Sequence, residues 1–258
     1  MMPLLSSTSE RGRPYLIAHR GNRAICPENT LAAFRQAIAD GADILETDLH
    51  VTADGAFVCI HDAMLERTTG AVGRVADWTL EEIKRLSASY GRAEFHNERI
   101  PTLSELAALL PPHVALALEL KTDRFLEREI CHKLSAELDQ AGVRGRSMIL
   151  SFDLERLRAM AGEAPDIPAG WITLARPFPL RGVQLLGPYW PLLLINPFYV
   201  LLAHHRGQAV CPLDPTPDGR LAWYVWLGCD AVLSDNPAAT RKKLDRLTRS
   251  QGAARGAG

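Results

Sequence analysis

The 258-residue sequence is poor in cysteine, and its positive and negative charges almost cancel. It contains five cysteines, an odd number, and none of them forms a Cys-x-x-Cys pair, so we expect reduced core thiols rather than a zinc site. The formal net charge is −1, so no overall field draws the protein onto nucleic acid or an anionic lipid surface. Any binding of an anion must therefore be local.

An uninterrupted apolar run long enough to cross a membrane is also missing. Residues 183–203 carry no formal charge and have the required length, but three prolines interrupt them. We interpret this segment as core, with a buried strand at Leu192–Ile195 and a helix from about Phe198. An apolar surface in peripheral contact with a membrane stays open as an alternative. Residues 1–14 lack the basic start and apolar centre of a signal peptide, so we expect a loose tail and a cytoplasmic protein.

Short apolar runs alternate with amphipathic stretches along most of the chain, which is typical of alternating strands and helices. The alternation breaks between Ala63 and Thr102 and then resumes. Eight strands in this order predict an α/β fold, the TIM (β/α)8 barrel, as one domain over residues 15–249, with a frayed tail at 250–258. The eight expected strands are Tyr15–Ala18, Ala42–Leu45, Val114–Leu120, Ser147–Ser151, Gly170–Leu174, Leu192–Ile195, Gln208–Pro212 and Ala231–Leu233.

Charged or titratable residues stand at the end of three apolar runs near the N-terminus. Burying such groups without a task is costly, and active groups of a TIM barrel lie at the carboxyl ends of its strands. We therefore expect these side chains to share one rim of the barrel. They are His19 and Arg20, Glu46 and Asp48, and His61 and Asp62.

The spacing of the acidic residues indicates a cation. Side chains alternate along a strand, so Glu46 and Asp48 point the same way and repel each other unless a proton or a cation lies between them. Glu119 and Lys121 end another apolar strand, so a third carboxylate completes a site for a hard divalent cation. Lys121 and Arg20 are left to hold an anion, and two histidines are available for proton transfer. Together these groups describe phosphoryl chemistry.

Nine short motifs follow one another along the chain: His19-Arg-Gly21, Pro27-Glu-Asn-Thr30, Glu46-Thr-Asp48, Asp54-Gly55, His61-Asp62, Arg67-Thr-Thr69, Glu119-Leu-Lys121, Ile149-Leu-Ser-Phe152 and Leu233-Ser-Asp-Asn-Pro237. In order and rough spacing they resemble the glycerophosphodiester phosphodiesterase family. The set is specific, although any one motif alone is weak.

The resemblance implies a barrel with a small insertion, at about residues 51–101, after the second barrel strand. It implies hydrolysis of a small-molecule glycerophosphodiester to sn-glycerol 3-phosphate and an alcohol, with one divalent cation, Mg²⁺ or Ca²⁺. Which histidine is the acid stays open, as does the choice between water and the substrate's glycerol hydroxyl as the nucleophile. The residues concerned are the metal ligands Glu46, Asp48 and Glu119, the phosphate-binding Arg20 and Lys121, and the catalytic His19 and His61.

One departure from the family pattern bears on substrate choice. Many members have a Trp-Thr motif at the seventh strand, where this chain has Val210-Cys-Pro-Leu-Asp-Pro215. A lysophospholipase D that acts on lysophospholipids is therefore an alternative, and a barrel that binds a phospho-ligand without cleaving it is a second. We expect a monomer or a homodimer that does not bind nucleic acid.

Overall fold

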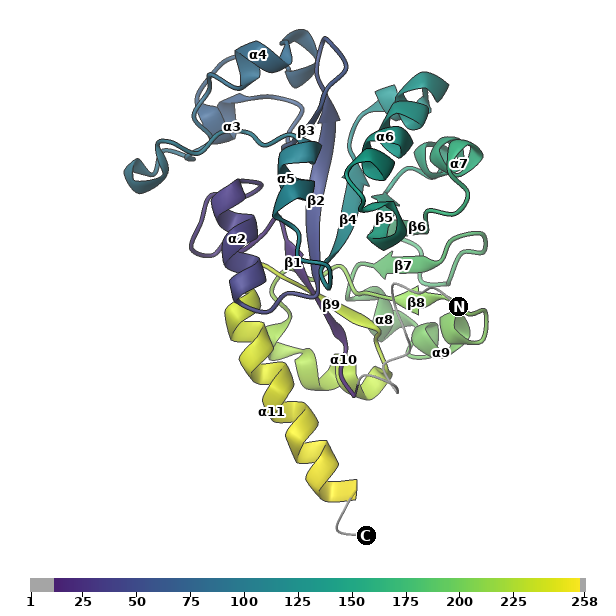
Figure 1. Ribbon diagram of the computed structural model, residues 1–258. Coiled ribbons are helices and arrows are strands. Elements are labelled where there is room, and N and C mark those ends of the chain that lie inside the picture. The colour runs from purple at the N-terminus through teal and green to yellow at the C-terminus, as the bar shows by residue number, and fades with distance from the viewer. Residues whose placement is uncertain (1–11, 256–258) are drawn as a thin grey trace.

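The computed structural model describes residues 12–255 and contains a nine-stranded sheet. Eight strands are parallel and pair in the order β8-β7-β6-β5-β4-β2-β1-β9, curling into a nearly closed barrel (Figure 1). The two end strands meet where the Asp230 N–H donates to the Val210 carbonyl at 2.9 Å. The barrel strands are β1 (Tyr15–His19), β2 (Ile44–Val51), β4 (Ala115–Leu120), β5 (Ser147–Ser151), β6 (Ala169–Thr173), β7 (Leu185–Pro188), β8 (Ala209–Val210) and β9 (Ala231–Ser234).

Helices cover the outside of this barrel, and their apolar faces form the larger part of the core against the sheet. Polar residues define where several of them begin. Thr30 accepts a hydrogen bond from the Ala33 N–H at the start of α2, and Thr102 and Glu105 form a capping box at the start of α5. The predicted (β/α)8 barrel is confirmed. The outer helices are α2 (Leu31–Ala39), α5 (Leu103–Leu109), α6 (Arg128–Gln140), α7 (Leu154–Glu163), α8 (Leu192–Ile195), α9 (Tyr199–His204), α10 (Leu221–Leu227) and α11 (Pro237–Arg255).

The segment between β2 and α5 leaves the barrel and returns to it. Its strand β3 (Phe57–Cys59) pairs antiparallel with β2, and α3 (Glu66–Thr69) and α4 (Leu80–Ile83) lie beyond the end of β2 (Figure 1). Thr79 and Glu82 form the capping box of α4. The segment has a small core of its own, made of Val58, Ile60, Leu65, Val75, Ile83, Ala88 and Ile100.

Two expectations about strands are wrong. Leu192–Ile195 forms the helical turn α8, and the sixth barrel strand lies earlier, at Leu185–Pro188. In α8 two adjacent residues, Leu192 and Leu193, are buried and the next two are exposed, whereas strand residues would alternate. The second strand is also longer than expected: Glu46 and Asp48 lie inside β2, because pairing with β4 and then with β3 extends it to Val51.

None of the helices described over residues 12–255 is long and apolar enough to cross a membrane. All five cysteines are buried free thiols, as expected. Residues 1–11 of the predicted N-terminal tail lie outside the described residues. Helix α11 continues to Arg255, so only 256–258 of the predicted C-terminal tail lie outside them.

Candidate active site

Three buried carboxylates meet where β2 and β4 run side by side. The parallel register pairs Asp48 with Glu119, and Glu46 lies two residues earlier on the same face of β2. One carboxylate oxygen from each of the three residues lies within 4.8 Å of the others. The structure therefore brings together the three metal ligands that the sequence predicted.

Burial and mutual repulsion dominate the electrostatics of this cluster. Burial, followed by repulsion from Asp48 and Glu119, raises the pKa of Glu46 well above its usual value. Burial also raises the pKa of Glu119, against the opposing effect of Lys121. Burial alone would raise the pKa of Asp48 too, but Arg20 and Lys121 outweigh it, so that pKa is lowered. Asp48 is thus the best anion of the three.

Two cationic side chains border the acids. Arg20 Nε lies 3.0 Å from Asp48 Oδ2, and the backbone N–H of Arg20 donates to Glu46 Oε2 at 3.0 Å. Lys121 Nζ lies 2.9 Å from Glu119 and 3.6 Å from Asp48 Oδ1. That Asp48 oxygen is buried and accepts no hydrogen bond from any described residue. An orphaned anionic oxygen facing two further carboxylates is a suitable ligand set for a hard divalent cation.

Each predicted catalytic histidine has a carboxylate behind it. His19 Nδ1 lies 2.7 Å from Asp235 Oδ1, and His61 Nδ1 lies 2.6 Å from Asp62 Oδ1. Burial lowers the pKa of both imidazoles. The hydrogen bond to Asp235 is the main opposing effect at His19, and the Asp48 carboxylate is the main one at His61. A carboxylate at Nδ1 orients the ring, so that Nε2 is the nitrogen available for proton transfer.

A second layer of residues supports the acids. The Asn29 amide donates to Asp48 Oδ2 at 2.9 Å, and its oxygen accepts from the Thr47 hydroxyl at 2.8 Å. Glu28 accepts from Arg20 at 3.1 Å and from Arg67 at 2.7 Å. The sequence reading assigned Glu28 and Asn29 to a motif without a role at the site. That motif directly follows the loop after His19, and its position could have indicated that Glu28 and Asn29 contact the site.

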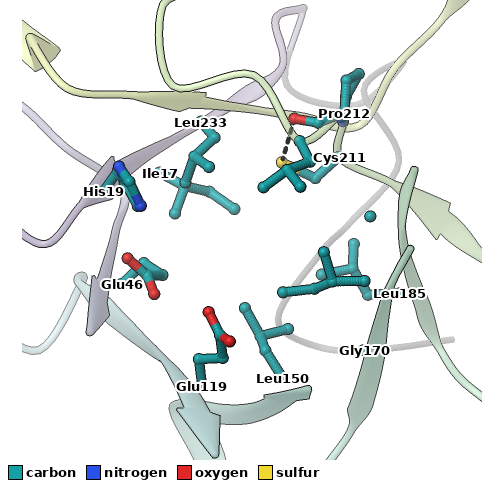
Figure 2. A pocket seen from close by; sticks show the side chains of 13 residues that line it. Ile17, His19, Glu46, Glu119, Leu150, Gly170, Leu185, Cys211, Pro212 and Leu233 are labelled. Carbon is teal, nitrogen blue, oxygen red and sulfur yellow. Dashed lines mark hydrogen bonds between the residues drawn. The ribbon is translucent and has the colours of Figure 1, made fainter. Parts of the chain in front are cut away.

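The opposite side of the barrel mouth is apolar. Figure 2 shows His19 and Glu46 on one side of a cavity, Leu185 across from them, and Leu150 next to Glu119. The cavity volume is about 50 Å³, and β5 to β9 supply only apolar residues, glycine and Cys211 to its wall. The three-carboxylate cluster thus lies beside an apolar chamber within one barrel.

Comparison with known proteins assigns the chain to a family. The model of the glycerophosphoryl diester phosphodiesterase family matches residues 19–239, which include every residue of the cluster. The chain belongs to this family. The resemblance inferred from the nine motifs is therefore confirmed, as is the assignment to the phosphodiesterases of this family.

Three members of this family match over most of their length. A glycerophosphodiester phosphodiesterase of Caldanaerobacter subterraneus subsp. tengcongensis is 41% identical over 237 residues, covering 86% of this chain and 94% of the relative. A phosphodiesterase of Oleispira antarctica, solved with its product sn-glycerol 3-phosphate, is 28% identical with a TM-score of 0.79, covering 93% of this chain and all of the other. A crystal structure from Silicibacter pomeroyi gives a TM-score of 0.78 at 28% identity, covering 93% of this chain and 97% of that one.

Proposed function

We propose that this protein is a metal-dependent glycerophosphodiester phosphodiesterase, which releases sn-glycerol 3-phosphate and an alcohol. The observation that carries the proposal is the joint presence of three converging carboxylates and two carboxylate-backed histidines at one barrel mouth. The names of the family's members supply the substrate class, and the product complex of the Oleispira enzyme supplies the product.

Glu46, Asp48 and Glu119 would hold one divalent cation, Mg²⁺ or Ca²⁺. The raised pKa values of Glu46 and Glu119 and the orphaned Asp48 oxygen all support a cation at this point. When bound, such an ion polarises a phosphoryl oxygen and offsets the negative charge that develops there.

The remaining groups of the chain position the diester and move protons. Arg20 and Lys121 bind the other phosphate oxygens, because each presents a fixed positive charge beside the acids. One of the two histidines, His19 or His61, takes the proton from the attacking oxygen as that oxygen bonds to phosphorus. The other histidine gives a proton to the alcohol oxygen as its bond to phosphorus breaks. With the substrate's own glycerol hydroxyl as nucleophile, a cyclic phosphate forms first and water opens it in a second step.

A second candidate function is a lysophospholipase D of the same chemistry. The apolar wall formed by Leu150, Ile172, Leu185 and Leu213 favours it, because an acyl chain needs such a surface. The segment at about residues 51–101 would then act as an insertion that closes over the other side of the mouth. The barrel and this insertion form one proposed catalytic domain, and cytoplasmic residence stays a prediction.

A substrate panel tests both candidates. Purified protein is incubated with glycerophosphocholine, glycerophosphoethanolamine or lysophosphatidylcholine, each with Mg²⁺, with Ca²⁺ or with a chelator. Release of sn-glycerol 3-phosphate from the first two substrates supports the proposal, and faster cleavage of the lysolipid supports the second candidate. Binding of these compounds without any turnover would favour the non-catalytic barrel. Turnover by metal-free protein in the presence of chelator would show that the reaction needs no cation.

A further inference from the structure

More than half of the exposed large hydrophobic side chains in the described structure come from one segment of the chain. Eight of the fifteen exposed large hydrophobic residues described in the structure fall within 29 consecutive positions. Ile195 is 68% exposed and Phe198 is 65% exposed, values that leave most of each side chain in water. We name this set the apolar rim patch: Leu174, Phe178, Tyr189, Leu194, Ile195, Phe198, Leu201 and Leu202.

Most of the apolar rim patch lies at the catalytic end of the barrel. Leu174 directly follows β6 and Tyr189 directly follows β7, so both stand at the carboxyl ends of parallel strands. The Asn196 amide donates to the Pro177 carbonyl at 2.8 Å and ties the loop after β6 to the end of α8. Leu192 and Leu193 anchor α8 in the core, which leaves its next two residues facing outward. The patch is therefore a fixed surface beside the mouth.

The charge of this region is one-sided. Residues 167–213 contain neither aspartate nor glutamate, although the whole chain has 30 acidic residues. The same residues include Arg176, Arg181 and Arg206, and all three are exposed. Arg176 stands in the loop after β6, whereas Arg181 and Arg206 stand shortly before β7 and β8, toward the amino ends of the strands. A surface that combines exposed leucine and phenylalanine with Arg176, in a stretch of chain without acidic residues, matches the interface of an anionic lipid bilayer.

We propose that the apolar rim patch docks this protein onto membranes that contain anionic phospholipid. Ile195 and Phe198 insert among the acyl chains near the headgroups, and Arg176 pairs with lipid phosphates. Because the loops after β6 and β7 carry the patch, docking brings the barrel mouth to the lipid surface. The chain then meets lipid-derived diesters where they are produced. This docking does not depend on the identity of the reaction.

Vesicle sedimentation tests the proposal. The full chain is mixed with vesicles of equal parts phosphatidylglycerol and phosphatidylcholine, and the bound fraction is compared with that on phosphatidylcholine alone. The Ile195→Glu/Phe198→Glu double variant should bind the anionic vesicles at least about tenfold more weakly. Arg176→Ser should weaken binding by about fivefold on anionic vesicles only. Binding of the wild type should fall as salt is added.

The matched control is Leu126→Glu. Leu126 is 47% exposed, but it stands among Asp123, Glu127 and Glu129, so its replacement should leave vesicle binding unchanged. Absence of wild-type binding, or equal binding by the double variant, would overturn the proposal. A wild-type dimer that the double variant disperses, without any binding to vesicles, would assign the patch to a second copy. Hydrolysis of soluble glycerophosphocholine, measured on every variant, reports the proposed function separately and should not change.

Discussion

The two sides of the barrel mouth differ in nearly every physical respect. The side built from β1, β2 and β4 is charged, largely buried and linked by hydrogen bonds, and it holds six of the seven residues predicted for the site. The seventh, His61, follows β3. The side built from β5 to β8 is apolar within the cavity and apolar again on the outer surface of α8 and α9. The difference fits the proposal that one side performs the chemistry, while the other side selects and meets the substrate.

The largest expected effect comes from removing either histidine on the charged side. His19→Ala or His61→Ala should lower kcat by about 10²–10⁴-fold, because positioned acids and bases contribute that much. Thermal unfolding should change little, so the loss is catalytic. Initial rates with glycerophosphocholine and a melting curve measure both quantities. Normal turnover in either variant would remove that histidine from the mechanism.

The backbone of the charged side is also tightly packed at Gly21. Its φ is +81°, and an added Cβ would lie 2.6–2.7 Å from the backbone and Cβ of Ala33 in α2. Gly21→Ala should therefore lower the free energy of unfolding by about 3 kcal/mol, from strain and overpacking together. Gly70→Ala is the control, since Gly70 has a φ of +76° but open space around it, and should cost about 1 kcal/mol. If chemical denaturation gave the same loss of unfolding free energy for both variants, Ala33 would be able to move aside without an energetic cost.

A smaller effect is expected from the carboxylate behind His19. Asp235→Asn keeps the size of the side chain but removes the charge that supports the imidazolium during proton transfer. We expect kcat to fall by about tenfold, with a changed pH–rate profile and an unchanged KM. A merely structural role would instead leave the profile in place and lower stability.

The smallest effect lies behind the apolar side. His204 Nε2 on α9 donates to Asp230 Oδ2 at 2.8 Å, and this hydrogen bond raises the pKa of His204 in the folded protein. The pair therefore stabilises the fold fully below pH 6.5, and the contribution is lost as the pH rises through the raised folded value. His204→Gln should lower the free energy of unfolding by under about 1 kcal/mol at pH 5.5 and by less at pH 8.5. An equal difference at both pH values would contradict this assignment.

The charged side was predicted well because its signals are local. Glu46 and Asp48 share a strand, and motifs of two to five residues mark the other groups. The pairing of His19 with Asp235 was not predicted, because 216 residues separate them and only the parallel pairing of β1 with β9 brings them together. A contact of this kind is a property of barrel closure, and no local pattern contains it.

The apolar side was predicted less well. Leu185–Pro188 and Leu192–Ile195 are both short apolar runs next to prolines, and periodicity cannot separate a strand from a single helical turn at this length. Pairing with β6 and β8 decides that the first run is the strand. Because Leu192–Ile195 was expected to be a buried strand, the exposed side chains of α8 were not predicted.

Cation binding tests the central account most directly. Metal-stripped wild-type protein is titrated with Mg²⁺ and with Ca²⁺ by calorimetry, beside the Glu46→Gln/Glu119→Gln double variant. The account predicts one ion per wild-type chain, restored hydrolysis of glycerophosphocholine after binding, and neither property in the variant. Full hydrolysis by the stripped wild type, or equal cation binding by both proteins, would contradict it.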